Sequence, residues 1–193
     1  LFTTISPVKP KKFVENSQGY FRKKAKNKSY NPYTKKTLYQ NRNSEAISVE
    51  FNKGHDLLAF PNIDSLWSLR KNQYRKKNFQ IVAEEIVEKK NNVHQLQFIA
   101  ADSLSTRGIL VKNIVKGGVL YELKAIVDTR ETPSQFVSDF FNNFEPLDTL
   151  VGKSLVKDKS LEFFDALRDK DSIVYKGYRF PYFDRSHIDS LLY

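Results

Sequence analysis

Three histidines, His55, His94 and His187, are the side chains best suited to acid–base or metal chemistry in this chain. None stands in an HExxH pair or at the three-to-five-residue spacing from another histidine that zinc sites use. His94 is in phase with Leu96 and Phe98 along a predicted strand. This phase favours a histidine at the edge of a sheet over a ligand or a catalytic base.

Two aspartates are the remaining candidates for catalysis. Asp56 follows His55 in a predicted loop, where the pair could act as a base and its orienting carboxylate. Neighbours on a loop rarely converge in this way, and no nucleophile is indicated. Asp128 stands at a strand end, where functional polar groups often gather. Because no motif supplies the convergent groups that a site needs, we expect no enzyme activity, no metal and no cofactor.

The pair Gly117-Gly118 could suggest a phosphate-binding loop. It lacks the GxxxxGK[ST] pattern, and it joins two predicted strands instead of a strand and a helix. Paired glycines accept the positive φ values of a type I′ turn. The pair therefore predicts a hairpin between residues 107–115 and 119–127.

Basic residues form the strongest candidate binding surface. The net charge is +10, and the first 90 residues hold 19 basic and 8 acidic residues, against 13 and 14 in the rest. Such a field attracts nucleic acid, anionic lipid or an acidic protein surface. The candidate basic surface comprises Arg22, Lys23, Lys24, Lys26, Lys28, Arg70, Lys71, Arg75, Lys76 and Lys77.

Two interpretations of this surface stay open. Tyr20, Phe21, Tyr30 and Tyr33 flank the first group, and aromatic rings could stack bases while lysines meet phosphates. The alternative is a solvated strand edge, where lysines also block edge-to-edge pairing. No signature of a known nucleic-acid-binding fold is present. Nucleic-acid binding is therefore the second hypothesis.

Composition sets the wider limits. The chain has no Cys, which excludes disulfides and thiolate sites, and no Met; it begins at Leu1, so we expect a fragment or processed product. No apolar run approaches the roughly 18 residues of a membrane-spanning helix, and residues 1–12 do not resemble a signal peptide. With 15 Phe and 40% hydrophobic residues, the chain can build a core. We expect a soluble, folded chain without a transmembrane segment.

The periodicity of apolar residues predicts the elements that position these groups. A linker over residues 1–12 precedes strands over 37–40 and 45–51. A helix follows over 62–77, with Asn62 as N-cap and Ile63, Leu66, Trp67 and Tyr74 inside. Alternating patterns then predict paired strands over residues 79–88 and 93–100, ahead of the glycine hairpin.

A second helix is predicted to begin at Thr132-Pro133, with Thr as N-cap and Pro at the first helical position. Phe136, Phe140 and Phe144 recur every four residues, so they form an apolar face that must pack on something. The order is strands, helix, meander, helix. It predicts an α+β domain over residues 13–150, an antiparallel sheet flanked by two helices.

Residues 151–193 are predicted to start a helical extension. A short amphipathic helix over residues 160–167 carries Leu161, Phe164 and Leu167, and Asp184 could cap another helix with Ile188, Leu191 and Leu192 inside. The candidate docking face comprises Phe163, Phe164, Leu167, Ile188, Leu191 and Leu192. If it serves a partner, an exposed apolar patch is expected near residues 150–193.

Two resemblances add to these patterns. The stretch Gly117-Gly118-Val119-Leu120-Tyr121, followed by Phe136, Phe140, Phe141 and Phe144, resembles the Mog1/PsbP-like α+β fold over residues 13–149. Residues 118–149 are also similar to a region of long Bacteroidetes envelope proteins of the TraB/GumN-like group, and this likeness covers roughly residues 95–170. The histidine motifs of the TraB module are absent, so the resemblance implies no catalytic residue.

The resulting hypothesis is a non-catalytic accessory or interaction domain of a larger bacterial cell-envelope protein. It would dock on adjacent domains of the same parent chain or on a membrane-associated assembly. The resemblance implies a periplasmic or envelope location, with the cytoplasm as the alternative. A basic nucleic-acid-binding module is the alternative function.

Overall fold

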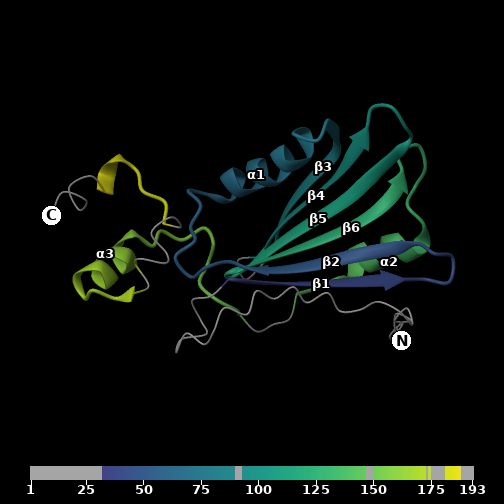
Figure 1. Ribbon diagram of the computed structural model, residues 1–193. Coiled ribbons are helices and arrows are strands. Elements are labelled where there is room, and N and C mark those ends of the chain that lie inside the picture. Colours follow the sequence, from purple (N-terminus) through teal and green to yellow (C-terminus); the bar gives the residue numbers. More distant parts are fainter. Residues whose placement is uncertain (1–31, 90–92, 147–149, 173, 175–180, 188–193) are drawn as a thin grey trace.

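A computed structural model describes residues 32–89, 93–146, 150–172, 174 and 181–187. The linker expected over residues 1–12 and the basic residues Arg22, Lys23, Lys24, Lys26 and Lys28 lie outside these ranges. So do Ile188, Leu191 and Leu192 of the candidate docking face. Figure 1 shows one twisted sheet with a helix against each face and a smaller helical part beyond one end.

The sheet has six strands in the order β1-β2-β6-β5-β4-β3, and every neighbouring pair is antiparallel. β3 to β6 form the expected meander, and the β1–β2 hairpin adds to it beside β6. This arrangement confirms the α+β class with an antiparallel sheet. The strands are β1 Tyr33–Gln40, β2 Ala46–Lys53, β3 Phe79–Lys89, β4 Val93–Asp102, β5 Arg107–Lys116 and β6 Val119–Asp128.

Helix α1, Ile63–Arg75, covers one face of the sheet. Its buried Leu66, Trp67 and Tyr74 pack on side chains of β4, β5 and β6 that include Leu96, Phe98, Val111, Val115 and Leu120. The predicted cap is present, because Asn62 Oδ1 accepts a hydrogen bond from the Ser65 amide at 2.8 Å. The inner face and start of this helix match the periodicity of its apolar residues.

Helix α2, Gln135–Asn143, covers the other face. Its buried Val137 and Phe141 join a cluster with side chains of β2, β5 and β6 that include Ile47, Leu110, Ile114, Tyr121 and Leu123. Lys112 is buried in β5 and donates to the carbonyl of Phe141, in the last turn of α2. A cation at this end of a helix satisfies a carbonyl and favours the helix dipole.

The predicted start of α2 was wrong by two residues. Ser134, not Thr132, is the N-cap, and its Oγ accepts from the Val137 amide at 3.3 Å. Pro133 therefore precedes the cap instead of occupying the first helical position. Phe136, Phe140 and Phe144 do stack along the helix, with ring centroids 6.5 and 6.0 Å apart.

The β5–β6 turn is a two-residue hairpin, but it is not the predicted type I′. Only Gly117 has a positive φ, 59°, whereas type I′ requires positive φ at both central residues. Gly118 meets a different demand. A Cβ placed there would lie 2.7 Å from the Lys153 carbonyl oxygen, so only glycine allows the backbone of residues 152–153 to approach.

The segment that follows α2 bonds to this hairpin tip, and we call residues 150–156 the crossing segment. The Gly118 amide donates to the Val151 carbonyl at 3.0 Å, and the Leu155 amide donates to the Gly117 carbonyl at 3.2 Å. Leu155 also enters the core beneath α1. Two segments more than thirty residues apart in the chain are therefore joined by backbone hydrogen bonds.

Helix α3, Ser160–Arg168, lies beyond the end of the sheet (Figure 1). A 3-10 turn, η2 Arg185–His187, follows it, with Asp184 just before the turn. Phe163 packs with Leu57, Val174 and Phe183 in a small separate core. No helix of the described residues is long and apolar enough to cross a membrane.

Candidate functional site

The basic residues of α1 do not form one free cationic surface. Arg70 Nη2 lies 2.7 Å from Glu122 Oε2, and Lys71 Nζ lies 2.6 Å from Glu84 Oε1. Arg75, Lys76 and Lys77 are exposed at the end of the helix. Of the five cations on α1 and in the turn after it, two therefore already have carboxylate partners, and three remain at the surface.

Glu122 is the centre of a buried polar cluster between α1 and the sheet. Its carboxylate accepts from Tyr74 Oη at 3.0 Å and from Lys124 Nζ at 3.1 Å, in addition to its ion pair with Arg70. Arg70 Nε also donates to Asn113 Oδ1 at 3.3 Å. Glu122 is 3% exposed and Asn113 is fully buried. The cluster ties one helix to two strands.

The pKa values follow from this enclosure. Burial alone raises the pKa of Glu122, but the charges of Arg70 and Lys124 outweigh burial and leave it below its ordinary value. Burial and the Glu122 charge raise the pKa of Tyr74 well above its ordinary value. Glu122 is therefore an ionised, fully compensated acceptor. An ionised carboxylate can stabilise the packing of α1 on the sheet, but it has no proton to donate as a general acid.

A second buried cluster lies where β2 ends and the chain approaches α3. Lys53 Nζ and Asp56 Oδ1 form an ion pair of 2.8 Å with both side chains nearly inaccessible. Lys159, just before α3, is 1% exposed, and its Nζ donates to the Leu58 carbonyl at 2.5 Å. His55 Nδ1 accepts from the Leu57 amide at 3.1 Å. These contacts join the β2–α1 loop to the start of α3.

Burial dominates the protonation of this cluster. It lowers the pKa of Lys159 to about 8, although the Asp56 charge opposes the shift. It also lowers the pKa of His55, again against Asp56. Lys159 therefore releases its proton more readily than an ordinary lysine, and both Lys159 and His55 are buried away from the surface. Asp56 Oδ1 is engaged by Lys53, and the Asp56 charge acts on both His55 and Lys159.

Asp128 holds the end of β6 by local hydrogen bonds. Its carboxylate accepts from Thr106 Oγ1 at 3.0 Å and from the Arg130 amide at 2.9 Å. The backbone hydrogen bond from Arg130 is the main reason that the pKa of Asp128 falls below its ordinary value. These contacts hold together the facing ends of β5 and β6.

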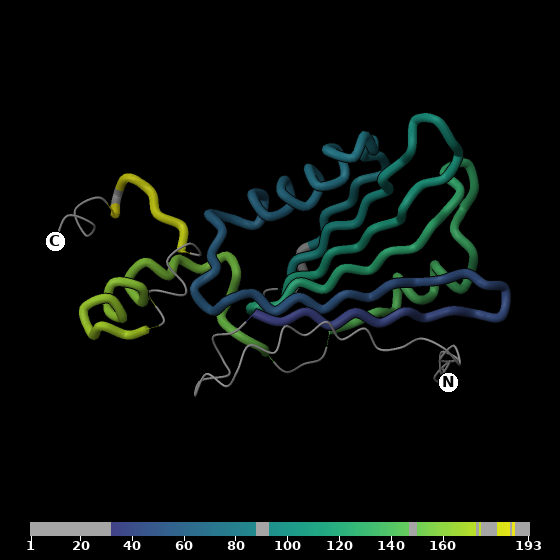
Figure 2. Tube along the Cα trace, in the orientation of Figure 1, coloured from purple at the N-terminus to yellow at the C-terminus, as the bar shows by residue number. Residues whose placement is uncertain are grey.

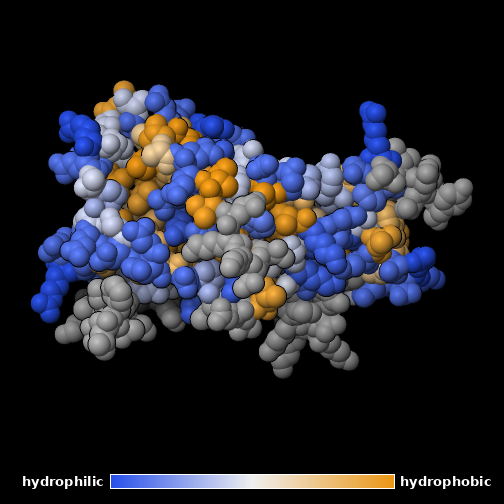
Figure 3. Space-filling model, turned by 180° about the vertical axis from the view of Figure 1, so that it is seen from behind, coloured by the Kyte–Doolittle hydropathy of each residue, from blue (hydrophilic) through white to orange (hydrophobic). Residues whose placement is uncertain are grey.

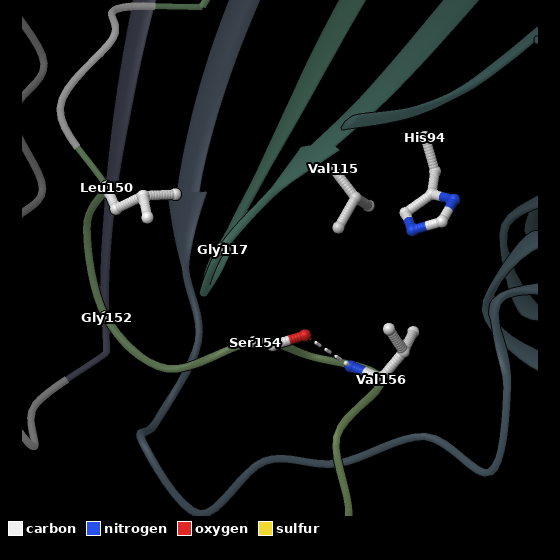
Figure 4. Close-up of a pocket in the computed structure, with 7 residues that line it drawn as sticks. All are labelled: His94, Val115, Gly117, Leu150, Gly152, Ser154 and Val156. Atoms are coloured by element: carbon white, nitrogen blue, oxygen red, sulfur yellow. Dashed lines mark hydrogen bonds between the residues drawn. The ribbon is translucent and has the colours of Figure 1, made fainter. Parts of the chain in front are cut away.

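His94 lines a small pocket at the end of the sheet (Figure 4). The pocket has a volume of about 160 Å³ and opens between β4, β5 and the crossing segment. Ser154 contributes a hydroxyl, but that Oγ accepts from the Val156 amide at 3.3 Å. No group of three His, Cys, Asp or Glu side chains in the described part of the chain could hold a metal ion. The remaining lining residues are Val115, Gly117, Leu150, Gly152 and Val156.

The candidate docking face divides within α3. Phe163 is buried, and Phe164 is half-buried against Phe163 and Phe183, with ring centroids 5.5 and 5.7 Å away. Leu161 is 76% exposed and Leu167 is 46% exposed, so both contribute apolar surface within the region where an exposed patch is expected. Figure 3 shows apolar groups at the α3 end of the molecule, at the right of the picture, among hydrophilic ones.

Sequence patterns did not reveal the two buried polar clusters. Glu122 and Lys124 alternate with apolar residues of β6, a pattern typical of a solvated face, yet α1 covers that face. For the second cluster, Lys53 and Asp56 lie three residues apart on either side of Gly54, a spacing that allows an ion pair. The sequence does not show that Lys159, from a distant segment, is buried in the same cluster. The sequence itself matches no protein-family model and no curated protein.

Proposed function

We propose that this chain is a non-catalytic interaction domain that docks on a protein partner through the outward side of α3. The partner is either an adjacent domain of the same parent chain or a member of a membrane-associated assembly. The likeness of residues 95–170 to envelope proteins supports a bacterial cell-envelope location. The observation that carries the proposal is the exposure of Leu161 and Leu167, 76% and 46%.

The geometry of α3 supports this use. Leu161, Phe164 and Leu167 are spaced three residues apart, so they form one row along the helix. Phe164, in the middle, is held by Phe163 and Phe183, which fixes the position of the row. Exposed large apolar side chains that share a row on a rigid element are typical of an interface.

The flanks of the row indicate the kind of partner. Glu162 is paired with Lys153, and Asp165 is paired with Arg168, so the charges beside the row are compensated within the chain. A strongly charged partner would gain little from such flanks. An amphipathic helix with its own apolar stripe would fit, because two such rows exclude water when they pack together.

Site-specific photo-crosslinking tests the proposal. A photoreactive amino acid replaces Leu161 in one variant and Leu104 in another, with the protein produced in its natural host. Leu104 is 94% exposed in the β4–β5 turn, so it is a matched exposed leucine at another site. We expect one discrete crosslinked protein from position 161 and none from position 104. Leu161→Glu combined with Leu167→Glu should abolish a crosslink from position 164 to the same protein.

The opposite result is equally clear. Crosslinks of the same yield from positions 161 and 104, or none from position 161, would show that the row is an ordinary solvated surface. The double glutamate variant must keep the unfolding midpoint of the parent chain, since both leucines are exposed. A folded variant that still crosslinks to the partner would also contradict the proposal.

A further inference from the structure

The two edges of the sheet differ in their ability to accept another strand. β1 pairs with β2 in eight consecutive residue pairs without a shift of register. β3, at the other edge, has a bulge between Val82 and Glu85, and Ala83 has a positive φ of 50°. A bulge twists an edge away from further pairing, whereas a regular strand leaves its backbone groups in line. Figure 2 shows β1 along the edge of the sheet that is farther from α1.

The hydrogen-bond pattern shows which backbone groups of β1 point outward. The Asn41 amide donates to the Glu45 carbonyl at 3.1 Å, and these residues continue the β1–β2 register. Opposite residues of an antiparallel pair alternate between bonded and non-bonded positions. Tyr33, Lys35, Thr37 and Tyr39 therefore bond to β2. The backbone N–H and C=O groups of Thr34, Lys36, Leu38 and Gln40 point away from the sheet.

We propose that this outer edge of β1 binds an extended, acidic strand of a partner protein, which adds to the sheet beside β1. Strand addition takes its affinity from main-chain hydrogen bonds and its specificity from alternate side chains. Four consecutive outward positions provide the main-chain part. The inference stands on β1 and is independent of the row on α3.

The charge of β1 selects the partner. Lys35 and Lys36 are exposed in the middle of the strand, one on each face of the sheet. A second copy of the chain, paired antiparallel about the same centre, would place its own lysines opposite or diagonal to these. Like charges across a strand pair are unfavourable, and opposite charges are favourable. The lysines thus disfavour self-association and favour a strand that carries Asp or Glu.

The aromatic residues of β1 indicate where the partner is apolar. Tyr33 stacks on Phe51 at 5.3 Å, and Tyr39 contacts Phe140 of α2 at 5.1 Å. Both tyrosines point to the α2 side of the sheet, with Lys35 between them. Tyr33 is 50% exposed. A partner strand with apolar residues beside the tyrosines and an acidic residue beside Lys35 would match this side.

The test uses a designed peptide on the full chain. A fluorescein-labelled eight-residue peptide with two adjacent Glu at its centre, one for each face of the sheet, and Val and Thr at the other positions is titrated and followed by anisotropy, and the same peptide with Lys in place of Glu serves as the comparison. We expect the acidic peptide to bind at least roughly tenfold more tightly, from two favourable cross-strand pairs replacing two unfavourable ones. Lys35→Glu combined with Lys36→Glu should reverse this preference.

Two further variants separate strand addition from general electrostatics. Lys76→Glu combined with Lys77→Glu makes the same charge change at the exposed end of α1 and should leave the preference in place. Leu38→Pro removes an outward N–H without removing a β1–β2 hydrogen bond, since proline is tolerated at such edge positions. It should weaken binding of the acidic peptide, while the unfolding midpoint shows that the sheet persists.

Amide hydrogen exchange supplies the structural measurement. Exchange at Lys36 and Leu38 should be fast in the chain alone and slow when the acidic peptide is bound. Slow exchange before peptide is added would overturn the proposal, because the edge would already be covered. Equal binding of the two peptides, no binding of the acidic peptide at millimolar concentration, or reversal by the α1 variant would overturn it as well.

Discussion

At the scale of single residues, Glu122 determines how α1 is held on the sheet. Changing Glu122 to Gln removes the charge that faces Arg70 and Lys124 and leaves amide hydrogens toward these cations. Removing one partner of a buried ion pair costs about 3 kcal/mol or more. We expect a loss of this size in the free energy of unfolding, measured with urea. Glu50→Gln is the control, because Glu50 is partly exposed and its Oε2 lies 4.0 Å from Lys124 Nζ. This change should lower the free energy of unfolding by less than about 1 kcal/mol.

A double variant tests whether the cost comes from the uncompensated charge. Glu122→Leu alone leaves Arg70 buried without its carboxylate. Adding Arg70→Met replaces both charges by apolar groups, a change that is often neutral or stabilising. The double variant should therefore be more stable than Glu122→Leu. If the two losses simply add, the Arg70–Glu122 contact is not coupled and this account of the cluster is wrong.

The free energy of unfolding at acidic pH should depend on the same carboxyl group, that of Glu122. The pKa of Glu122 in the folded chain lies below its ordinary value of 4.5. A depressed carboxyl pKa contributes stability that is complete above the unfolded-state pKa and is lost as pH falls through the folded-state pKa. The wild-type chain should thus lose stability below about pH 4.5, and Glu122→Gln should lose less over the same range. Urea unfolding at several acidic pH values measures the difference.

Lys159 should change the free energy of unfolding at alkaline pH. Its folded pKa of about 8 lies below the ordinary 10.5. Between these values the unfolded chain retains a proton that the folded chain has released, so stability rises with pH. Urea unfolding from about pH 7.5 to about pH 9.5 should show this rise in the wild type and a smaller one in Lys159→Met. Lys76→Met, at an exposed position, should keep the full rise.

Residue-level prediction succeeded where the cause is local and failed where it is not. Asn62 was identified as a cap because the cap bond reaches only three residues along the chain. Glu122 was placed on the face opposite Leu123, which is correct, but its burial depends on α1, about fifty residues away. Lys159 likewise needs the carbonyl of Leu58. No alternation of residues within one strand contains such information.

At the scale of elements, the spacing of apolar residues predicted most helices and strands, but it did not place all of their ends correctly. Thr132-Pro133 has the composition of a helix start, but Ser134 provides an equally good cap two residues later. The spacing of apolar residues alone does not show which side of α3 faces the core, since Leu161 and Leu167 could lie in a buried row and are exposed in the structure. The small core beneath α3 instead takes Phe163, with Leu57 and Val174 from other segments. Packing between segments, and not the spacing of apolar residues within α3, therefore decides which of its side chains are buried.

The β5–β6 hairpin offers a test at this scale. Gly118→Ala places a methyl group against the backbone of the crossing segment, 2.7 Å from the Lys153 oxygen. We expect a loss of about 2 kcal/mol or more in unfolding free energy, and faster amide exchange at Leu155. Gly117→Asn is the comparison, because asparagine tolerates the positive φ found there and a Cβ at this position would lie 3.3 Å from the Val151 carbonyl oxygen, a milder contact with the crossing segment than at Gly118; it should cost about 1 kcal/mol or less. Equal losses would mean that turn conformation, and not the crossing segment, sets the need for glycine.

At the scale of the whole molecule, only part of the +10 charge is available to an outside ligand on α1. Arg70 and Lys71 face carboxylates, which leaves Arg75, Lys76 and Lys77 for an outside ligand. We expect labelled single-stranded and duplex oligonucleotides to bind weakly at low salt and not at near-physiological salt, as measured by anisotropy. Micromolar binding that survives physiological salt and falls when the three exposed cations become Glu would favour the nucleic-acid hypothesis instead. Arg70 is left unchanged in this test, because it is paired with the buried Glu122.

The crossing segment also has a consequence for the order in which the protein folds. The meander from β3 to β6 consists of neighbours along the chain, so its hairpins can form early and locally. The β1–β2 hairpin must then close a loop of more than sixty residues to reach β6, and the tip of β5–β6 gains its last backbone partners only when Leu155 is in place. Closure of such loops carries an entropic cost that local contacts do not. On the ribosome, the meander can therefore form once residue 128 has emerged, whereas the hairpin tip is completed only after the crossing segment has left the exit tunnel. A chain released before that point would present an unfinished sheet end to chaperones and proteases.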